Sequence, residues 1–180
     1  APPVAPLSSL LDELAAYLRP PGQGIHAFST GKEAIDAATA AYLGDAWNPS
    51  DSWRGHLSTL ATTPPPIALL AIPCDTGAGI VRGAAWGPAA IREGLGAAPV
   101  FDLGDVFCIP HLLDDEMCSE AQLTRSRASV YADLPAAQRA TMPVSALSIA
   151  TRVYKLLARL CPSTKIMLLG GDHSVTWPAM

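Results

Sequence analysis

The sequence has 180 residues, of which 49% are hydrophobic, enough for one globular domain with a real core. The net charge of −4 comes without a basic stripe, so nothing favours a nucleic-acid partner. The apolar runs are too short to span a bilayer, and the first residues lack the basic and apolar regions of a signal peptide. We therefore expect a cytoplasmic protein that binds neither nucleic acid nor membrane, with its four cysteines reduced.

The first 66 residues predict a helical extension that ends in a proline-rich linker. Leucines at helical spacing over residues 7–18 indicate a first helix, with Ser8 or Ser9 as its N-cap and the Pro-Pro-Gly at 20–22 as its end. A second helix is predicted over 30–44, and "NPSDSWRGHL" is typical of a turn and one more helical piece. The stiff "TTPPP" at 62–66 marks the boundary with a second region, residues 67–180.

After the linker, the pattern changes to strands that alternate with helices. Strands are predicted over 67–72, 99–106 and 165–171, and helices over 87–96, 119–134 and 144–160. The first and third strands are continuous apolar runs, as expected where both faces of a strand are covered. The alternation predicts an α/β fold with a parallel sheet, whose function lies at the carboxyl ends of the strands.

Polar side chains lie at or just past the end of each of the three predicted strands. They are Asp75, Asp102, Asp105, Asp172 and His173. Because parallel strands end at the same edge of a sheet, we expect these side chains to approach one another. Carboxylates with one imidazole suit a divalent cation such as Mn²⁺.

Structural interpretations of the same residues remain open at this point. A histidine after a strand is often a satisfied structural residue, and Asp172 also suits the cap of a helix that starts near Ser174. Asp102 and Asp105 are also compatible with ordinary turn and capping roles. Arg82, in the glycine-rich loop, suits either an anion or an ion pair with Asp75.

Three motifs resemble those of one enzyme family. "GGDHSVTWP" at 170–178 is similar to the first metal-binding signature of the ureohydrolases, the family of arginases, agmatinases and formiminoglutamases. "IPCDTGAGIVRGAAWGPAAIR" at 72–92 resembles the opening strand and loop, most of all in agmatinase-like and guanidine-hydrolase-like members. "DLGDV" at 102–106 resembles the motif of the second strand. The three occur in the family's order over residues 67–180.

The resemblance implies a three-layer α/β/α fold and a site for two Mn²⁺ ions, with Ni²⁺ as an alternative metal. It implies hydrolysis of a guanidino or formimino C–N bond by a hydroxide that bridges the two metals. His173 would be a metal ligand, Asp172 would lie behind the ligands, and Gly170 and Gly171 would shape the turn. Further residues that would shape the site are Asp75, Asp102 and Asp105. The family also suggests a homotrimer or homohexamer, and we expect the N-terminal extension to contribute to its interface.

The chain departs from the family in its metal ligands. The family's D-x-H-x-D and D-x-D-x-x-D-P motifs, which carry the other ligands, do not occur here. We therefore expect this chain to be the N-terminal half of the enzyme, inactive alone, with the remaining ligands on a second polypeptide. Cleavage of a precursor, a split gene and a chain break all remain open as its origin.

The substrate also remains open between arginine, agmatine, guanidinobutyrate, guanidine and formiminoglutamate. Two other functions remain open too. One is a non-catalytic regulatory or assembly subunit with a ureohydrolase-like fold. The other is an α/β binding module without a metal.

Overall fold

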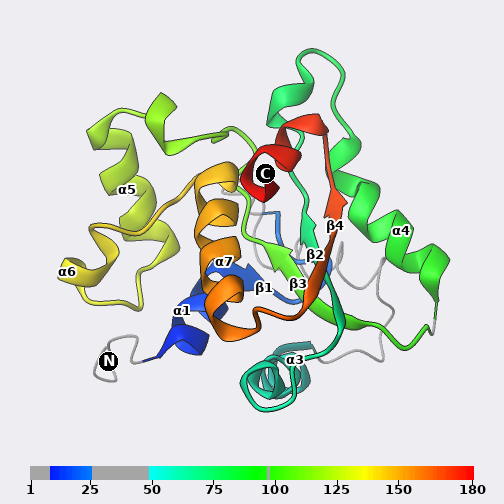
Figure 1. The fold of residues 1–180 in the computed structure, drawn as a ribbon. Coiled ribbons are helices and arrows are strands. Elements are labelled where there is room, and N and C mark those ends of the chain that lie inside the picture. Colours follow the sequence, from blue (N-terminus) through cyan, green and yellow to red (C-terminus); the bar gives the residue numbers. More distant parts are fainter. Residues whose placement is uncertain (1–8, 26–48, 97) are drawn as a thin grey trace.

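A computed structural model describes residues 9–25, 49–96 and 98–180 of the chain. Its centre is a four-stranded sheet in the order β1-β3-β2-β4 (Figure 1). The strands are β1 (Leu18–Arg19), β2 (Ile67–Ile72), β3 (Phe101–Val106) and β4 (Lys165–Gly170). β2 pairs in parallel with β3 and β4, whereas β1 pairs with β3 antiparallel. The parallel α/β sheet predicted from the sequence is therefore confirmed.

The register of the parallel strands brings their carboxyl ends to one edge. β2 and β4 pair without interruption from Ile67 with Lys165 to Ile72 with Gly170. β2 and β3 pair from Ala68 to Ala71, with an irregularity after Leu69. The loops after β2, β3 and β4 consequently leave the sheet together, as the sequence predicts.

Helices occupy both sides of the sheet (Figure 1). The α-helices are α1 (Leu10–Tyr17), α3 (Pro49–Ser58), α4 (Gly87–Leu95), α5 (Glu120–Val130), α6 (Ala136–Arg139) and α7 (Ala146–Leu160). The 3-10 helices are η1 (Thr59–Ala61), η2 (Thr76–Ala78), η3 (Ala84–Trp86), η4 (Asp115–Met117) and η5 (His173–Ala179). The predicted helices at 87–96, 119–134 and 144–160 are confirmed, with ends that differ by a few residues. The helix predicted over 30–44 lies outside the described residues.

The N-terminal segment follows its prediction up to the end of the first helix. Ser9 caps α1 by accepting a hydrogen bond from the backbone N–H of Asp12 at 3.1 Å. The helix stops at Tyr17, and Leu18 pairs with Val106 in the sheet, so the prediction that Leu18 belongs to the helix is wrong. Pairing with a strand almost ninety residues away outweighs the local helical pattern.

The two faces of β2 contact different layers, because alternate side chains of a strand point to opposite faces. Ala68, Leu70 and Ile72 join the main core, which includes the buried side of α7. Leu69 and Ala71 pack with Leu169 in a second, smaller cluster on the face that α4 partly covers. The result is a layer of helices, a sheet and a further helix, in keeping with a three-layer arrangement.

β4 differs from the expectation of a strand covered on both faces. Among the described strands it lies at the edge of the sheet and pairs with β2 alone. Its Met167 is 52% exposed, and Ile67 of the neighbouring strand β2 is 50% exposed.

In the described part of the chain, every helix is too short or too polar to cross a membrane.

Candidate functional site

The turn from β4 into η5 carries the motif Gly-Gly-Asp-His, and it lies tightly against the end of β2. The backbone N–H of Gly171 donates to the carbonyl of Ile72 at 3.1 Å, and that of Asp172 donates to the carbonyl of Cys74 at 2.9 Å. A Cβ at Gly171 would lie 1.8 Å from the Cys74 carbonyl oxygen, and one at Gly170 would lie 2.9 Å from Val175. The two glycines therefore allow a close approach of the backbones that a side chain at either position would prevent.

The side chain of Asp172 caps η5. Its Oδ1 accepts hydrogen bonds from the backbone N–H of Ser174 at 2.8 Å and from the Ser174 hydroxyl. The capping alternative is thus confirmed, yet it uses only one of the two carboxylate oxygens. Oδ2 is buried without a hydrogen-bond partner among the described residues, 3.2 Å from the position of a Cβ on Gly77. A buried oxygen of this kind calls for a donor or cation that the described residues do not supply.

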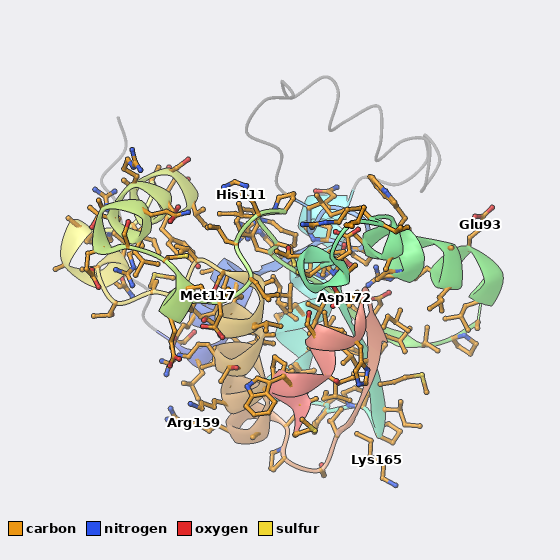
Figure 2. The ribbon with its side chains drawn as sticks, turned by 90° about the horizontal axis from the view of Figure 1, so that it is seen from above. Glu93, His111, Met117, Arg159, Lys165 and Asp172 are labelled. Carbon is orange, nitrogen blue, oxygen red and sulfur yellow. The ribbon has the colours of Figure 1, made fainter. Side chains whose placement is uncertain are left out.

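His173 is the first residue of η5, directly after the capping aspartate, and its side chain is exposed. Its backbone carbonyl accepts a hydrogen bond from the Thr176 hydroxyl at 2.7 Å. No hydrogen bond or ion pair joins its imidazole to any residue in the described ranges. The imidazole is therefore not a satisfied structural group in this part of the chain. Figure 2 shows the adjacent Asp172 near the centre of this edge, seen from above.

Asp75, after β2, holds the glycine-rich loop together. Its Oδ2 accepts from the backbone N–H of Gly83 at 2.7 Å, and its Oδ1 accepts from Arg82 at 3.3 Å. Burial alone would raise the pKa of the Asp75 carboxyl, but these donors outweigh burial and lower it. Arg82 therefore pairs with Asp75, which decides the question that the sequence leaves open.

Asp102 and Asp105, in β3, bind one arginine of α4. Arg92 donates to both oxygens of Asp102, at 2.7 and 2.9 Å, and to Oδ1 of Asp105 at 2.6 Å. Burial alone would lower the pKa of Arg92, but the charges and hydrogen bonds of the two carboxylates outweigh it and raise the pKa.

The second oxygen of Asp105 is also occupied. Oδ2 accepts hydrogen bonds from the backbone N–H groups of Gly22 and Gly24, at 2.9 and 3.0 Å. Asp105 therefore fastens the segment after β1 onto the sheet. We refer to Arg92, Asp102 and Asp105 together as the Arg92 clamp. Nothing in the sequence points to Arg92, because an arginine ten residues before an aspartate carries no local signal of contact.

The structure corrects the expectation that all five polar residues converge. Within residues 9–25, 49–96 and 98–180, no group of three or more histidine, cysteine, aspartate or glutamate side chains is placed to hold a metal ion. The physical reason is that Asp75, Asp102 and Asp105 already bind arginines and backbone N–H groups. The described residues do not form a complete metal site, and His173 is the ligand candidate that they leave without a partner.

A pair of thiols lies behind the turn and was also missed from the sequence. The Cys74 thiol donates to the Thr76 hydroxyl at 3.4 Å, and that hydroxyl donates to the carbonyl of Pro110 at 2.8 Å. A hydrogen bond from the Cys108 thiol, together with Thr76, lowers the pKa of Cys74 to about 6 although burial opposes the change. Burial raises the pKa of the Cys108 thiol itself. The signal in the sequence is indirect: each cysteine follows its strand by a similar number of residues.

Comparison with known proteins gives one match. A model of the Arginase family matches residues 65–180, which is more than half of the chain. No curated protein matches, and no solved structure matches either. The matched residues begin just before β2 and include the turn that carries His173.

Proposed function

Because the chain belongs to the arginase family, we propose that it forms part of a hydrolase that cleaves a C–N bond of a guanidino or formimino group. Membership of the family itself suggests metal-dependent hydrolysis of guanidino compounds in general. One observation of the structure supports the proposal most strongly. The imidazole of His173 is exposed at the carboxyl edge of the sheet and has no partner among the described residues.

The proposal gives His173 the role of a ligand to Mn²⁺, with Ni²⁺ as the alternative. The position favours this role, because a tightly fixed Gly-Gly turn holds the start of η5 in one place. A ligand fixed in this way binds a metal without losing much conformational freedom. The unpartnered Oδ2 of Asp172 lies behind it and adds a negative charge to the same region.

The other ligands are proposed to lie on a second polypeptide that carries the D-x-H-x-D and D-x-D-x-x-D-P motifs. Two observations support this. The described residues supply no complete metal-binding group, and among the described strands β4 pairs on one side only, beside the exposed Met167. A parallel strand with apolar side chains is normally covered by further strands and helices.

A non-catalytic subunit is the second candidate. It is favoured by the ion pairs that occupy Asp75, Asp102 and Asp105, since these carboxylates serve the fold. Such a subunit would keep the arginase-like sheet and would bind a catalytic partner, without holding a metal itself.

The test is a hydrolysis assay of the complete protein, purified with all polypeptides that accompany this chain. Arginine, agmatine, guanidinobutyrate and guanidine are assayed for urea or ammonia, and formiminoglutamate for formamide, each with Mn²⁺ or Ni²⁺. We expect turnover of one of them, and we expect His173→Ala to lose most of it. His111→Ala is the matched control, because His111 is also an exposed histidine but lies in the loop after β3. If no substrate is turned over, or if His173→Ala keeps full turnover, the proposal is wrong.

A further inference from the structure

Cys74 and Cys108 are neighbouring thiols at the ends of two adjacent parallel strands. Ala71 of β2 is paired with Asp105 of β3, and each cysteine follows its paired residue by three positions. Neighbouring strands of a sheet lie about 4.8 Å apart, and β2 and β3 end two residues before Cys74 and Cys108, so the two cysteines leave the sheet close together. The Cys108 thiol donates to the carbonyl of Val106 at 3.3 Å and also interacts with the Cys74 thiol, and both side chains are buried, with exposed fractions of 3% for Cys74 and 1% for Cys108.

The other two cysteines of the chain do not form such a pair. Neither Cys118 nor Cys161 interacts with another cysteine: the Cys118 thiol donates to the carbonyl of Asp114 at 3.5 Å, and the Cys161 thiol donates to the carbonyl of Leu157 at 3.4 Å. All four are free thiols in the structure. Cys74 and Cys108 are the two cysteines whose side chains interact with each other.

The pair lies directly behind the turn that carries the family motif. The carbonyl of Cys74 accepts the hydrogen bond of the Asp172 N–H at 2.9 Å. The backbone of Gly171 is so close to Cys74 that a Cβ there would overlap three Cys74 backbone atoms. A change of the Cys74 backbone therefore moves Gly171 and Asp172, and with them the start of η5.

We propose that Cys74 and Cys108 form a reversible disulfide on reaction with a hydroperoxide such as hydrogen peroxide, and that this bond displaces the turn at Gly171 and Asp172. The proposal assigns the pair as a covalent modification site. It does not depend on whether His173 binds a metal.

The reaction proceeds in two steps. The Cys74 sulfur attacks the peroxide, whose O–O bond breaks, and the products are a sulfenic acid on Cys74 and water. The Cys108 sulfur then attacks the Cys74 sulfur, the S–S bond forms, and the hydroxyl leaves with the proton of Cys108 as a second water. Two thiols lose two electrons and two protons, and one peroxide is reduced to two waters. The lowered pKa of Cys74 supports its role as the attacking group, because the thiolate is the nucleophile.

The buried position of the pair is compatible with a small oxidant. The loop from η2 to η3 lies beside Cys74, and it is largely exposed at residues 79–84. A Cβ atom added at Gly79 or Gly83 would have no other heavy atom within 4 Å, so that part of the loop is loosely packed. Local opening of such loops costs little free energy and would admit a molecule of the size of hydrogen peroxide.

The experiment uses the full chain with its companion polypeptides. The native protein is treated with hydrogen peroxide, remaining thiols are alkylated, and peptides are analysed by mass spectrometry with and without reduction. We expect a cross-linked pair of peptides, containing Cys74 and Cys108 and lighter by two hydrogen atoms, that reduction separates. In Cys108→Ser we expect a Cys74 sulfenic acid that dimedone traps. The matched control, Cys161→Ser, removes a buried thiol elsewhere and should cross-link as the wild type does.

Displacement of the turn at Gly171 and Asp172 is measured by hydrogen–deuterium exchange of the oxidised and reduced forms. We expect faster exchange at the amides of Gly171 and Asp172 after oxidation. Absence of the cross-link in the native wild type would overturn the modification site, whatever the variants do. A cross-link without any change of exchange at these amides would overturn the displacement of the turn. Neither readout requires hydrolase activity, so failure here is distinct from failure of the proposed function.

Discussion

β3 and the turn after β4 both carry aspartates, but these residues differ in what they do. After β4, one oxygen of Asp172 and the imidazole of His173 have no partner in the described part of the chain. In β3, the four carboxylate oxygens of Asp102 and Asp105 all accept hydrogen bonds, from Arg92 or from backbone N–H groups. A carboxylate at a strand end is therefore available to a ligand only where the fold has not already used its oxygens.

The largest expected effect of this difference is on stability at the end of β3. In Arg92→Ala, Asp105 stays buried with its charge uncompensated, and we expect a loss of roughly 3–5 kcal/mol in the free energy of unfolding. The measurement is urea unfolding followed by circular dichroism. Arg159→Ala removes an exposed arginine from the end of α7 and should change stability by less than about 0.5 kcal/mol. Equal effects of the two variants would mean that the Arg92 clamp is not what holds β3.

A smaller effect is expected from the glycine that fixes the turn after β4. In Gly171→Ala the new methyl group would overlap the Cys74 backbone, which must shift, and we expect a loss of about 1–3 kcal/mol from the overpacking. Gly94→Ala is the matched control, because it lies in α4 with no atom within 4 Å of its Cβ position. Alanine favours a helix there, so the control should gain about 0.5–1 kcal/mol. Thermal unfolding of both variants measures the difference, and a gain in both would refute the tight contact.

Two substitutions of Asp172 separate the effect of its cap on η5 from the effect of its negative charge beside His173. Asp172→Ala removes the acceptor for the Ser174 N–H and should cost about 1 kcal/mol. Asp172→Asn keeps a capping oxygen and should cost much less, while it removes the negative charge beside His173. If the asparagine variant is as unstable as the alanine variant in urea unfolding, the charge and not the cap stabilises this turn.

The smallest expected effect concerns Asp75 and the pH. The pKa of this carboxyl is lower in the folded protein than its ordinary value of 3.8. Its contribution to stability is therefore present above that value and is lost as the pH falls through the lower, folded pKa. Arg82→Ala removes a half-exposed partner, so we expect at most about 1 kcal/mol at neutral pH. That difference between variant and wild type should shrink in acid, and a difference that grows on acidification would contradict this assignment.

The sequence predicts the elements well where short-range signals determine them. The continuous apolar run at 67–72 predicts β2 with the observed bounds, and Ser9 caps α1 as its position before a leucine-rich helix indicates. The family resemblance, carried by the motifs that follow β2 and β4 and by the motif within β3, is confirmed by the match over residues 65–180. These features depend on periodicity, caps and motifs, which a sequence shows directly.

The sequence does not predict features that depend on contacts between distant segments. β1 has only two residues and exists because Leu18 pairs with Val106 of β3. The Arg92 clamp and the Cys74–Cys108 pair depend on how α4, β2 and β3 are placed against one another. For this reason the sequence predicts that Asp102 and Asp105 lie in the candidate site with Asp172. In the structure, both carboxylates instead bind Arg92.

The most direct test of the account is the metal content of the complete protein after loading with Mn²⁺. Metal is measured by mass spectrometry in the wild type, His173→Ala and Asp102→Asn, each at a temperature where circular dichroism shows it folded. We expect His173→Ala to lose at least one metal ion per chain, whereas Asp102→Asn should keep the wild-type content. Full metal in His173→Ala, or loss of metal in folded Asp102→Asn, would contradict the claim that the turn after β4 carries the ligand whereas the aspartates of β3 serve the fold.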